Sequence, residues 1–310
     1  MMNLKNTIFI AVIILFIFQL IVMKQDAKIK ETTHKPTIAL STFSLYDIAI
    51  NLVGDTAEPF LILPLGVDAH SYEPSPKEVI KLYKSDLVVY SGAGLEPWID
   101  GFDFKNKAID MSLHVELKNF IEDGQDKENH NHSDSKVDPH YWLDLQNMIK
   151  ATEFITKELI ALLPANRELY SKNRDTYVDM LKRLHKDYKE KLSTCRVSTI
   201  IVNHNAFSYI SNIYGFNIEA LSGLSPDAQP SAKSMLTLIE HVKEHNISTI
   251  FFESFASDKA IKSIATEAKV SVNTLQPLGN ITADEAEKNL SYEDIMRSNL
   301  EKISKALECR

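Results

Sequence analysis

Three histidines in this 310-residue sequence have neighbours that would hold an imidazole ring in a fixed position. His140 comes directly after Asp-Pro, and the fixed φ of that proline presents the imidazole from a stiff turn with two aromatic residues behind it. His70 lies in a loop bounded by glycine and proline, and His204 lies between two asparagines. Histidine is commonly a half-buried packing residue, so each of the three on its own is weak evidence. Together they are candidates for a metal site, since neutral imidazole is a good ligand for a divalent ion.

The spacing of these histidines limits the kind of site that they could form. His70 and His140 are 70 residues apart, and His140 and His204 are 64 residues apart. This is far too wide for a local zinc knot of the finger type, whose ligands lie close together in sequence. The three rings can meet only where the fold brings distant segments together. We therefore expect a site between two lobes.

The first half of the sequence alternates between strand and helix patterns. Buried strands are predicted at residues 37–42, 59–63 and 87–90, with helices at 45–52 and 78–83 between them. This order predicts a parallel sheet with crossover helices. His70 follows the carboxyl end of the second strand, which is the edge where open α/β sheets bind ligands.

The second half of the sequence repeats this pattern. Strands are predicted at residues 199–202, 218–221, 249–252 and 272–275, and helices at 206–214, 231–245, 258–269 and 292–308. His204, Glu253 and Gln276 each follow the carboxyl end of one of these strands. Polar residues therefore gather at the same sheet edge in both halves, where a ligand site is expected.

Two helical stretches lie between the halves, at residues 146–163 and 165–194. The second has no internal glycine or proline and, at 1.5 Å per residue, would reach roughly 45 Å, which is longer than one small domain needs. The predicted fold is therefore α/β, with two lobes, each a mostly parallel sheet with helices, joined by one long rigid helix. The predicted boundaries are 37–164 for the N-terminal lobe, 165–194 for the linking helix and 195–310 for the C-terminal lobe.

Residues 1–36 are predicted to lie outside the fold. A short basic start precedes an almost wholly apolar run at residues 8–23, which indicates a secretory signal peptide or a short uncleaved anchor, and a polar tether follows. The run is shorter than the ~20 residues that span a bilayer comfortably. We expect an exported, periplasmic protein, tethered to the inner membrane through this segment if it is not cleaved.

The composition argues against one class of partner and leaves the pairing of the two cysteines undecided. The sequence is 44% hydrophobic and 25% charged, which is ordinary for a globular protein, and its net charge of −8 argues against nucleic-acid binding. Cys195 and Cys309 could pair in an oxidising compartment, but their distance does not follow from the sequence. We expect a monomer.

An acidic, low-complexity stretch at residues 122–136 contains two further histidines, His130 and His132. It has no helix or strand period, so we expect a polar loop within the N-terminal lobe. The loop histidines could capture metal weakly and pass it inward, as short histidine-rich tracts can. The alternative is a solvated loop whose histidines have no function.

Four motifs carry a resemblance to a known family. They are Gly-Val-Asp-Ala-His-Ser-Tyr-Glu-Pro at 66–74, Asp-Pro-His-Tyr-Trp at 138–142, Val-Asn-His-Asn-Ala-Phe at 202–207 and Thr-Leu-Gln-Pro-Leu-Gly at 274–279. With the acidic loop before the second motif, the sequence resembles the periplasmic solute-binding proteins of metal ABC transporters, cluster A-I, of the zinc-uptake type. The resemblance covers nearly all residues after about residue 36. Any one motif would be weak, but together they are specific.

The resemblance implies a binding protein, not an enzyme, with the metal held between two α/β lobes. It also implies that His70, His140 and His204 are the ligands and that Zn²⁺ is the transported ion. Manganese members of the family carry a carboxylate in the third position, and three imidazoles suit Zn²⁺ better than the oxygen-preferring Mn²⁺. The implied partners are a membrane permease of the ABC type and, through it, a cytoplasmic ATPase.

The fourth ligand stays open at this point. Many family members have aspartate where Gln276 stands, and some have an acid directly before the first histidine, where this chain has Ala69. A neutral amide is a weaker zinc ligand than a carboxylate. The candidates are therefore water, Gln276, and Glu253 if its strand end points inward. For Glu253 we favour a contact with a ligand histidine over direct ligation.

Two other functions fit part of the pattern. Three histidines and a water also make a catalytic zinc site, so a zinc-dependent hydrolase is one alternative. Against it, no His-Glu-x-x-His motif occurs and no acid is clearly placed as a general base. The other alternative is a manganese-specific binding protein, or a surface adhesin or chelator without a transporter. No P-loop motif is present, so any ATP hydrolysis would have to lie in a partner.

Overall fold

A computed structural model describes residues 35–104, 108–119, 137–222, 247–253 and 259–310, together with Gln19, Leu236, residues 239–242 and Glu244. The chain divides into two units, residues 1–36 and residues 37–310, and the fold described below is that of the second. The predicted signal segment and the loop with His130 and His132 lie outside the described residues. Across the part of the chain that is described, no helix is both long enough and apolar enough to cross a membrane.

The first sheet is parallel and has the strand order β2-β1-β3-β4. Its strands and helices are β1 (Thr37–Leu40), α2 (Phe43–Val53), β2 (Glu58–Leu61), α3 (Pro76–Lys84), β3 (Leu87–Tyr90) and β4 (Ala108–Asp110). α3 begins at a capping box in which Ser75 and Glu78 each accept a hydrogen bond from the other's backbone N–H, with Pro76 at the first helical position. The strand and helix order confirms the prediction for this half.

The second sheet is also parallel, with the order β10-β9-β7-β8. Its elements are β7 (Thr199–His204), α6 (Ser208–Tyr214), β8 (Asn217–Ser222), β9 (Thr249–Glu253), α8 (Lys259–Ala268) and β10 (Ser271–Leu275). β7 is buried along its whole length, as its apolar run predicts, and it ends at His204. Most of the predicted helix at 231–245 lies outside the described residues, but residues 239–242 are helical.

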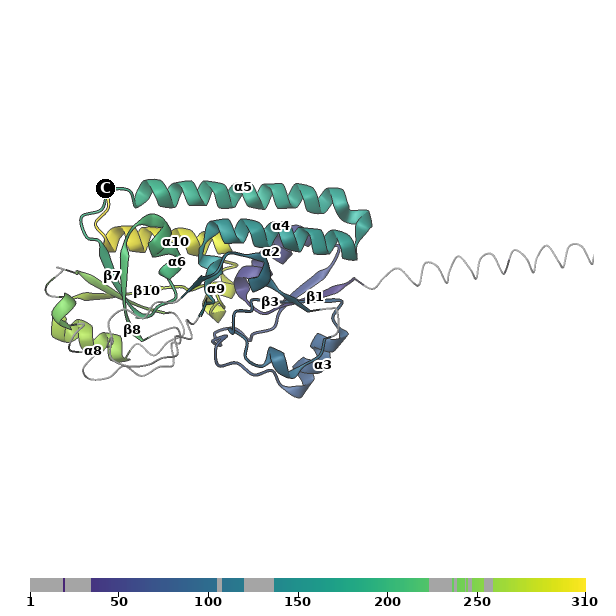
Figure 1. The fold of residues 1–310 in the computed structure, drawn as a ribbon, viewed down its shortest axis with the longest axis horizontal. Coiled ribbons are helices and arrows are strands. Elements are labelled where there is room, and N and C mark those ends of the chain that lie inside the picture. Colours follow the sequence, from purple (N-terminus) through teal and green to yellow (C-terminus); the bar gives the residue numbers. More distant parts are fainter. Residues whose placement is uncertain are drawn as a thin grey trace, which may run out of the picture. The chain divides into compact units, whose positions relative to one another are not determined.

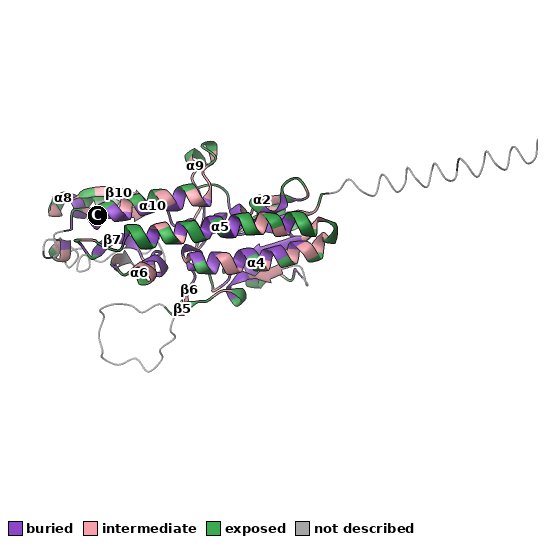
Figure 2. Cartoon of the chain, turned by 90° about the horizontal axis from the view of Figure 1, so that it is seen from above, coloured by how far each residue is buried: buried purple, intermediate pink, exposed green. Residues whose placement is uncertain are grey.

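One long helix, α5 (Arg167–Lys191), contacts helices from both halves of the chain (Figures 1 and 2). It packs on α2, on α4 (Leu145–Leu162) and on α10 (Tyr292–Ala306). Its 25 residues give a length of roughly 37 Å at 1.5 Å per residue. This is shorter than predicted, because Pro164–Asn166 forms a separate 3-10 turn before the helix and the helix ends at Lys191 instead of residue 194. The predicted connecting helix is confirmed.

The buried apolar residues of the two sheets belong largely to one cluster. It runs from Ile38 in β1 through Trp142 to Leu275 in β10, and a smaller cluster around Ile250 lies in the second half. Because a close-packed core resists relative motion of its parts, we expect the two sheets to move little against each other. Residues 37–310 form one unit, so the lobe boundaries given above stay a prediction.

A buried carboxylate joins three helices at this core. Asp47 of α2 accepts hydrogen bonds from the hydroxyl of Tyr177 in α5 at 2.7 Å and from the backbone N of Tyr292 in α10 at 3.1 Å. Loss of water on burial raises the pKa of Asp47, and the two hydrogen bonds oppose that rise. Polar contacts as well as packing therefore fix α5 to the elements on either side.

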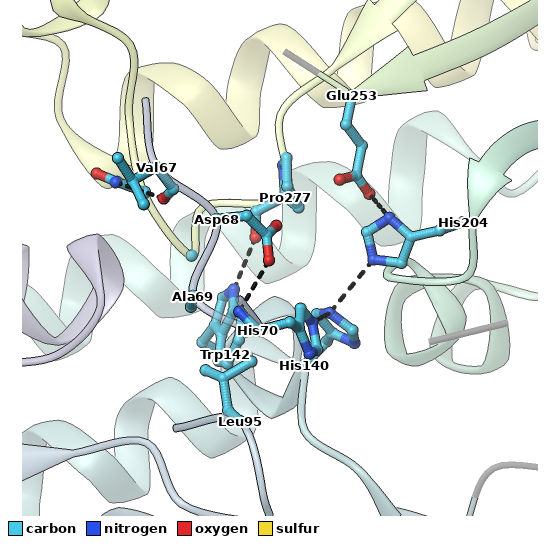
Figure 3. A pocket seen from close by; sticks show the side chains of 12 residues that line it. Val67, Asp68, Ala69, His70, Leu95, His140, Trp142, His204, Glu253 and Pro277 are labelled. Carbon is cyan, nitrogen blue, oxygen red and sulfur yellow. Dashed lines mark hydrogen bonds and ion pairs between the residues drawn. The ribbon is translucent and has the colours of Figure 1, made fainter. Parts of the chain in front are cut away.

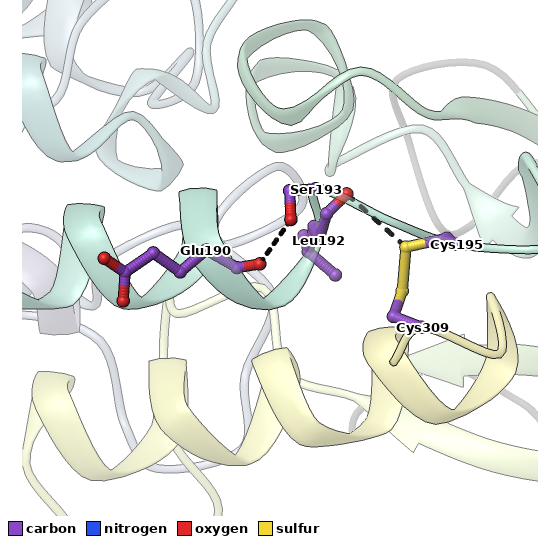
Figure 4. Close-up of a disulfide and its surroundings, with 5 residues drawn as sticks. All are labelled: Glu190, Leu192, Ser193, Cys195 and Cys309. Carbon is purple, nitrogen blue, oxygen red and sulfur yellow. Dashed lines mark hydrogen bonds between the residues drawn. A yellow bond between two sulfur atoms is a disulfide. The ribbon is translucent and has the colours of Figure 1, made fainter.

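Cys195 and Cys309 form a disulfide, which answers the question that the sequence left open (Figure 4). The bond links the segment after α5 to the segment after α10, and the two cysteines are separated by 114 residues in sequence. Beside it, the backbone N of Val197 donates to the carbonyl of Leu307. A cross-link across so long a loop stabilises mainly by restricting the unfolded chain.

Replacing both cysteines with serine should lower the free energy of unfolding by about 2–4 kcal/mol, because the unfolded chain regains the conformational freedom of a long loop. Guanidinium denaturation followed by circular dichroism measures this difference. As a control, a reductant should destabilise the parent protein and leave the double-serine variant unchanged. Equal stability of parent and variant would contradict the prediction.

Candidate metal centre

Three imidazole rings converge in a small pocket (Figure 3). His70 lies in the loop between β2 and α3, His140 lies between β6 (Val137–Asp138) and a 3-10 turn, and His204 ends β7. Nε2 of His140 is 3.3 Å from Nε2 of His70 and 3.5 Å from Nε2 of His204. One ligand nitrogen from each ring lies within 4.8 Å of the other two. The fold thus brings the predicted trio together, with His204 coming from the second sheet.

These distances fit a shared ion better than direct contacts between rings. Tetrahedral Zn²⁺ with nitrogen ligands at about 2.0–2.1 Å separates two ligand nitrogens by ~3.3–3.4 Å. A hydrogen bond could explain one of the two close pairs. However, Nε2 of His140 has either one proton or one lone pair, so it cannot bond to both neighbours at once. An ion at the common centre accounts for both distances.

Two of the imidazoles have a carboxylate against their other nitrogen. Oδ1 of Asp138 lies 2.8 Å from Nδ1 of His140, and the hydroxyl of Ser208 donates to the other oxygen of that carboxylate. Glu253, at the end of β9, places Oε1 2.5 Å from Nδ1 of His204, although these two atoms are not aligned as a hydrogen bond. At His140, a proton held on Nδ1 by Asp138 leaves the Nε2 lone pair free, and here Nε2 faces the centre of the cluster.

The loops of His70 and His140 share a local hydrogen bond. In each loop an aspartate two residues before the histidine accepts from the backbone N of that histidine, Asp68 at 2.8 Å and Asp138 at 3.0 Å. Such a bond fixes the backbone from which the ring projects. The Asp-x-His spacing that the two motifs share is a sequence signal for these aspartates, for which no role was predicted.

Burial keeps two of the three clustered rings neutral, those of His70 and His204. Loss of water, together with the charge of the neighbouring imidazoles, lowers the pKa of His70 and of His204 to about 3. Both rings are therefore unprotonated at neutral pH, which is the form that binds a metal. Burial also raises the pKa of Glu253 to about 8. Burial would raise the pKa of Asp138 too, but its contacts with His140 and Ser208 outweigh it and lower that pKa.

The two side chains predicted as candidates for a fourth ligand have different positions. Glu253 lines the pocket but lies against the far nitrogen of His204. The side chain of Gln276 is used elsewhere: Nε2 donates to Glu285 at 2.8 Å, and Oε1 accepts from the backbone N of Leu278 at 3.1 Å. The structure therefore does not bring Gln276 to the cluster. Among the described residues, the set of mutually close ligand atoms contains the three histidines and no carboxylate.

A sequence model of the family described as "Zinc-uptake complex component A periplasmic" matches residues 38–306. The chain belongs to this family. The zinc-binding lipoprotein AdcA of Streptococcus pneumoniae serotype 4 is 32% identical over 289 residues, which cover 90% of this chain and 57% of AdcA. The high-affinity zinc uptake system protein ZnuA of Bacillus subtilis is 30% identical over 278 residues, which cover 87% of each chain.

A solved structure agrees with this membership. The Zn(II)-bound ZnuA-like domain of Streptococcus pneumoniae AdcA superposes with a TM-score of 0.74 at 32% identity, and the match covers 89% of this chain and 100% of that domain. The present chain thus spans a little over half the length of AdcA and matches its ZnuA-like domain throughout. The two-lobed α/β fold predicted from the sequence is the fold of this family.

A buried acid supports one wall of the pocket in this family member. Leu95 lines the pocket, and the adjacent Glu96 is only 3% exposed. Glu96 accepts hydrogen bonds from the backbone N of Ser91 and of Gly92, both at 2.9 Å. It thereby holds the turn at residues 92–94, in which all three residues have positive φ. Burial raises the pKa of Glu96 to about 7 in spite of these hydrogen bonds.

In the parent protein the free energy of unfolding should fall between about pH 4.5 and pH 7. Glu96→Gln should make that decrease smaller. The folded-state pKa of Glu96 is raised from its ordinary value of 4.5 to about 7, so the folded protein holds a proton that the unfolded chain loses in this range. Stability from this group is therefore full below pH 4.5 and is lost as the pH rises to 7, by about 3 kcal/mol in total.

Unfolding free energies of parent and variant, measured at several pH values, test this prediction. Glu267→Gln on the exposed surface of α8 is the matched control and should leave the pH dependence unchanged. Parallel pH curves for the parent and Glu96→Gln would show that Glu96 does not titrate in this range.

Proposed function

We propose that this protein captures Zn²⁺ outside the cytoplasm and delivers it to a membrane permease of the ABC type that a cytoplasmic ATPase drives. The observation that carries the proposal is the convergence of three imidazole nitrogens, two pairs of which lie at distances that suit one tetrahedral ion. The names of the relatives, a zinc-binding lipoprotein and a zinc uptake protein, support it. Zinc is the cargo of the site and not a catalytic cofactor.

The roles of the side chains follow from their contacts. His70, His140 and His204 bind the ion through Nε2, while Asp138 and Glu253 orient two of the rings from behind. The pocket has a cavity of about 20 Å³, which is room for about one water molecule. Because the described residues bring three ligand atoms to the cluster, we infer that a water molecule takes the fourth position on the ion.

The ligand set favours zinc over manganese. Imidazole nitrogens suit the borderline-soft Zn²⁺, whereas Mn²⁺ prefers carboxylate, carbonyl and water oxygens. The three mutually close ligand atoms in the described part of the chain are all histidine nitrogens. We therefore assign Zn²⁺ as the preferred ion.

The same contacts favour a carrier over the alternative of a zinc hydrolase. A hydrolase needs a general base within reach of the metal-bound water. Three acids lie next to these rings. Asp138 and Glu253 face Nδ1 atoms on the side away from the centre of the cluster, and Asp68 accepts from the backbone N of His70. An acid in that position orients a ligand and does not accept a proton from the water.

Export and delivery complete the proposal. The apolar run at residues 8–23 would direct the chain out of the cytoplasm, either released into the periplasm or tethered to the inner membrane. Because one core joins the two sheets, binding and release of the ion would need only small rearrangements. Zinc transfer therefore takes place on the permease rather than through wide opening of the free protein.

His140→Ala should weaken zinc binding by more than the 10–100-fold that loss of an outer contact typically costs, because it removes the central ligand of the three. A titration in competition with a chromophoric zinc chelator measures the affinity, and circular dichroism checks that the variant is folded. His114→Ala is the matched control, since His114 stacks on Phe154 outside the cluster and should leave the affinity unchanged.

Two outcomes of this titration would overturn the proposal. If His140→Ala binds zinc with the affinity of the parent, the three histidines do not form the zinc site. Displacement of zinc by an equal concentration of Mn²⁺ in the parent protein would make manganese the cargo.

A further inference from the structure

The segment at residues 276–281, which follows β10, leaves the second sheet and contacts the first half of the chain beside the metal pocket. We call residues 276–281 the crossing loop. Its backbone carbonyl at Gly279 accepts from the N of Phe43 at 2.9 Å, and the carbonyl at Ile281 accepts from the N of Gly66 at 2.9 Å. Three residues of the loop, Pro277, Gly279 and Asn280, line the pocket itself (Figure 3 labels Pro277).

The crossing loop contacts the chain close to His140. The indole Nε1 of Trp142, two residues after His140, donates to the carbonyl of Pro277 at 2.7 Å in a buried position. Gly279 lies beside the same indole ring, since a Cβ there would be in ordinary contact with Trp142 Cζ2 at 3.5 Å. The loop therefore fixes the ring that packs edge-on against His140.

The crossing loop also contacts the chain close to His70, through Asn280. The side-chain Nδ2 of Asn280 donates to the carbonyl of Pro64 at 2.7 Å and to the carbonyl of Val67 at 2.8 Å. These two carbonyls lie at the ends of one turn, because the N of Val67 donates to Pro64 O and Gly66 has the positive φ that a turn of type II needs. Oδ1 of Asn280 accepts from the backbone N of Ile281 at 2.8 Å.

The chemistry of these three bonds requires an amide. Both hydrogens of one planar NH₂ group are used, one for each carbonyl, and the amide oxygen is satisfied as well. Asn280 is only 2% exposed, so water cannot replace a lost partner. An aspartate would have the same shape but no donors, and it would place oxygen against two carbonyl oxygens.

We propose that Asn280 is a positioning residue for zinc, which holds the turn at residues 64–67 so that His70 meets His140 and His204 at ligand distance. The inference rests on the proposed zinc-binding function and adds to it a residue that does not touch the ion. Asn280 acts through His70: the turn that it holds ends three residues before His70, and Asp68 fixes the backbone in between. Removing its donors would release His70 while His140 and His204 keep their own supports.

Asn280→Asp tests this inference in a double-mutant cycle with His70→Ala. Zinc affinity is measured by chelator competition for the parent, each single variant and the double variant. Asn280→Asp alone should weaken zinc binding about 10–100-fold, the range for loss of an outer contact to a ligand. In the His70→Ala background the same substitution should change the affinity less than 3-fold, because the ring through which Asn280 acts is already gone.

Matched variants separate positioning from general destabilisation. Asn289→Asp makes the same charge change on an exposed residue and should leave zinc affinity unchanged. Asn280→Ser, which keeps one donor, should lose less affinity than Asn280→Asp and serves as the test if the aspartate variant does not fold. Thermal denaturation of each metal-free variant reports any loss of stability separately.

Each result decides between distinct conclusions. Equal losses of affinity in the parent and His70→Ala backgrounds would mean that Asn280 supports the fold in general, and would overturn the inference. Parent-like affinity of both Asn280 variants would overturn it as well, while the proposed function would stand. If the parent itself does not bind zinc, the proposed function fails first.

Discussion

The central constraint on this structure is the cluster of three imidazole rings. Their nitrogens are held close enough to share one ion, in a pocket with room for little water. Burial lowers the pKa of His70 and of His204 to about 3, so protonation cannot relieve the crowding of their lone pairs at neutral pH. Nε2 of His140 is close to both and can hydrogen-bond to only one. A divalent cation satisfies all three nitrogens at once, so the arrangement is poised for an ion.

The rest of the fold supplies the rigidity that this arrangement needs. Parallel strands direct loops from two sheets to one place, and a common core with α5 across it limits how far those sheets can shift. Asp138 holds the ring of His140 from behind, Glu253 lies behind the ring of His204, and the loop at residues 276–281 joins the backbone near His70 to that near His140. Function here follows from fixed geometry more than from motion.

Much of this could be predicted from local sequence patterns. Apolar runs and helical spacing predicted the succession of strands and helices along the chain, and the polar residues at strand ends pointed to the site edge, because parallel strands bring their carboxyl ends together. The direction of a single buried side chain was not predictable. Gln276 follows a strand as expected, but its amide binds Glu285 and the backbone of Leu278 instead of facing the ion. Asn280 showed no signal at all, since its partner Pro64 lies 216 residues away in sequence.

The most direct test of the account is X-ray absorption at the zinc edge of the zinc-loaded full chain. The account predicts one ion per protein with three imidazole rings at about 2.0–2.1 Å and one further oxygen ligand. A first shell made of oxygen ligands, or one with fewer than three imidazoles, would contradict it.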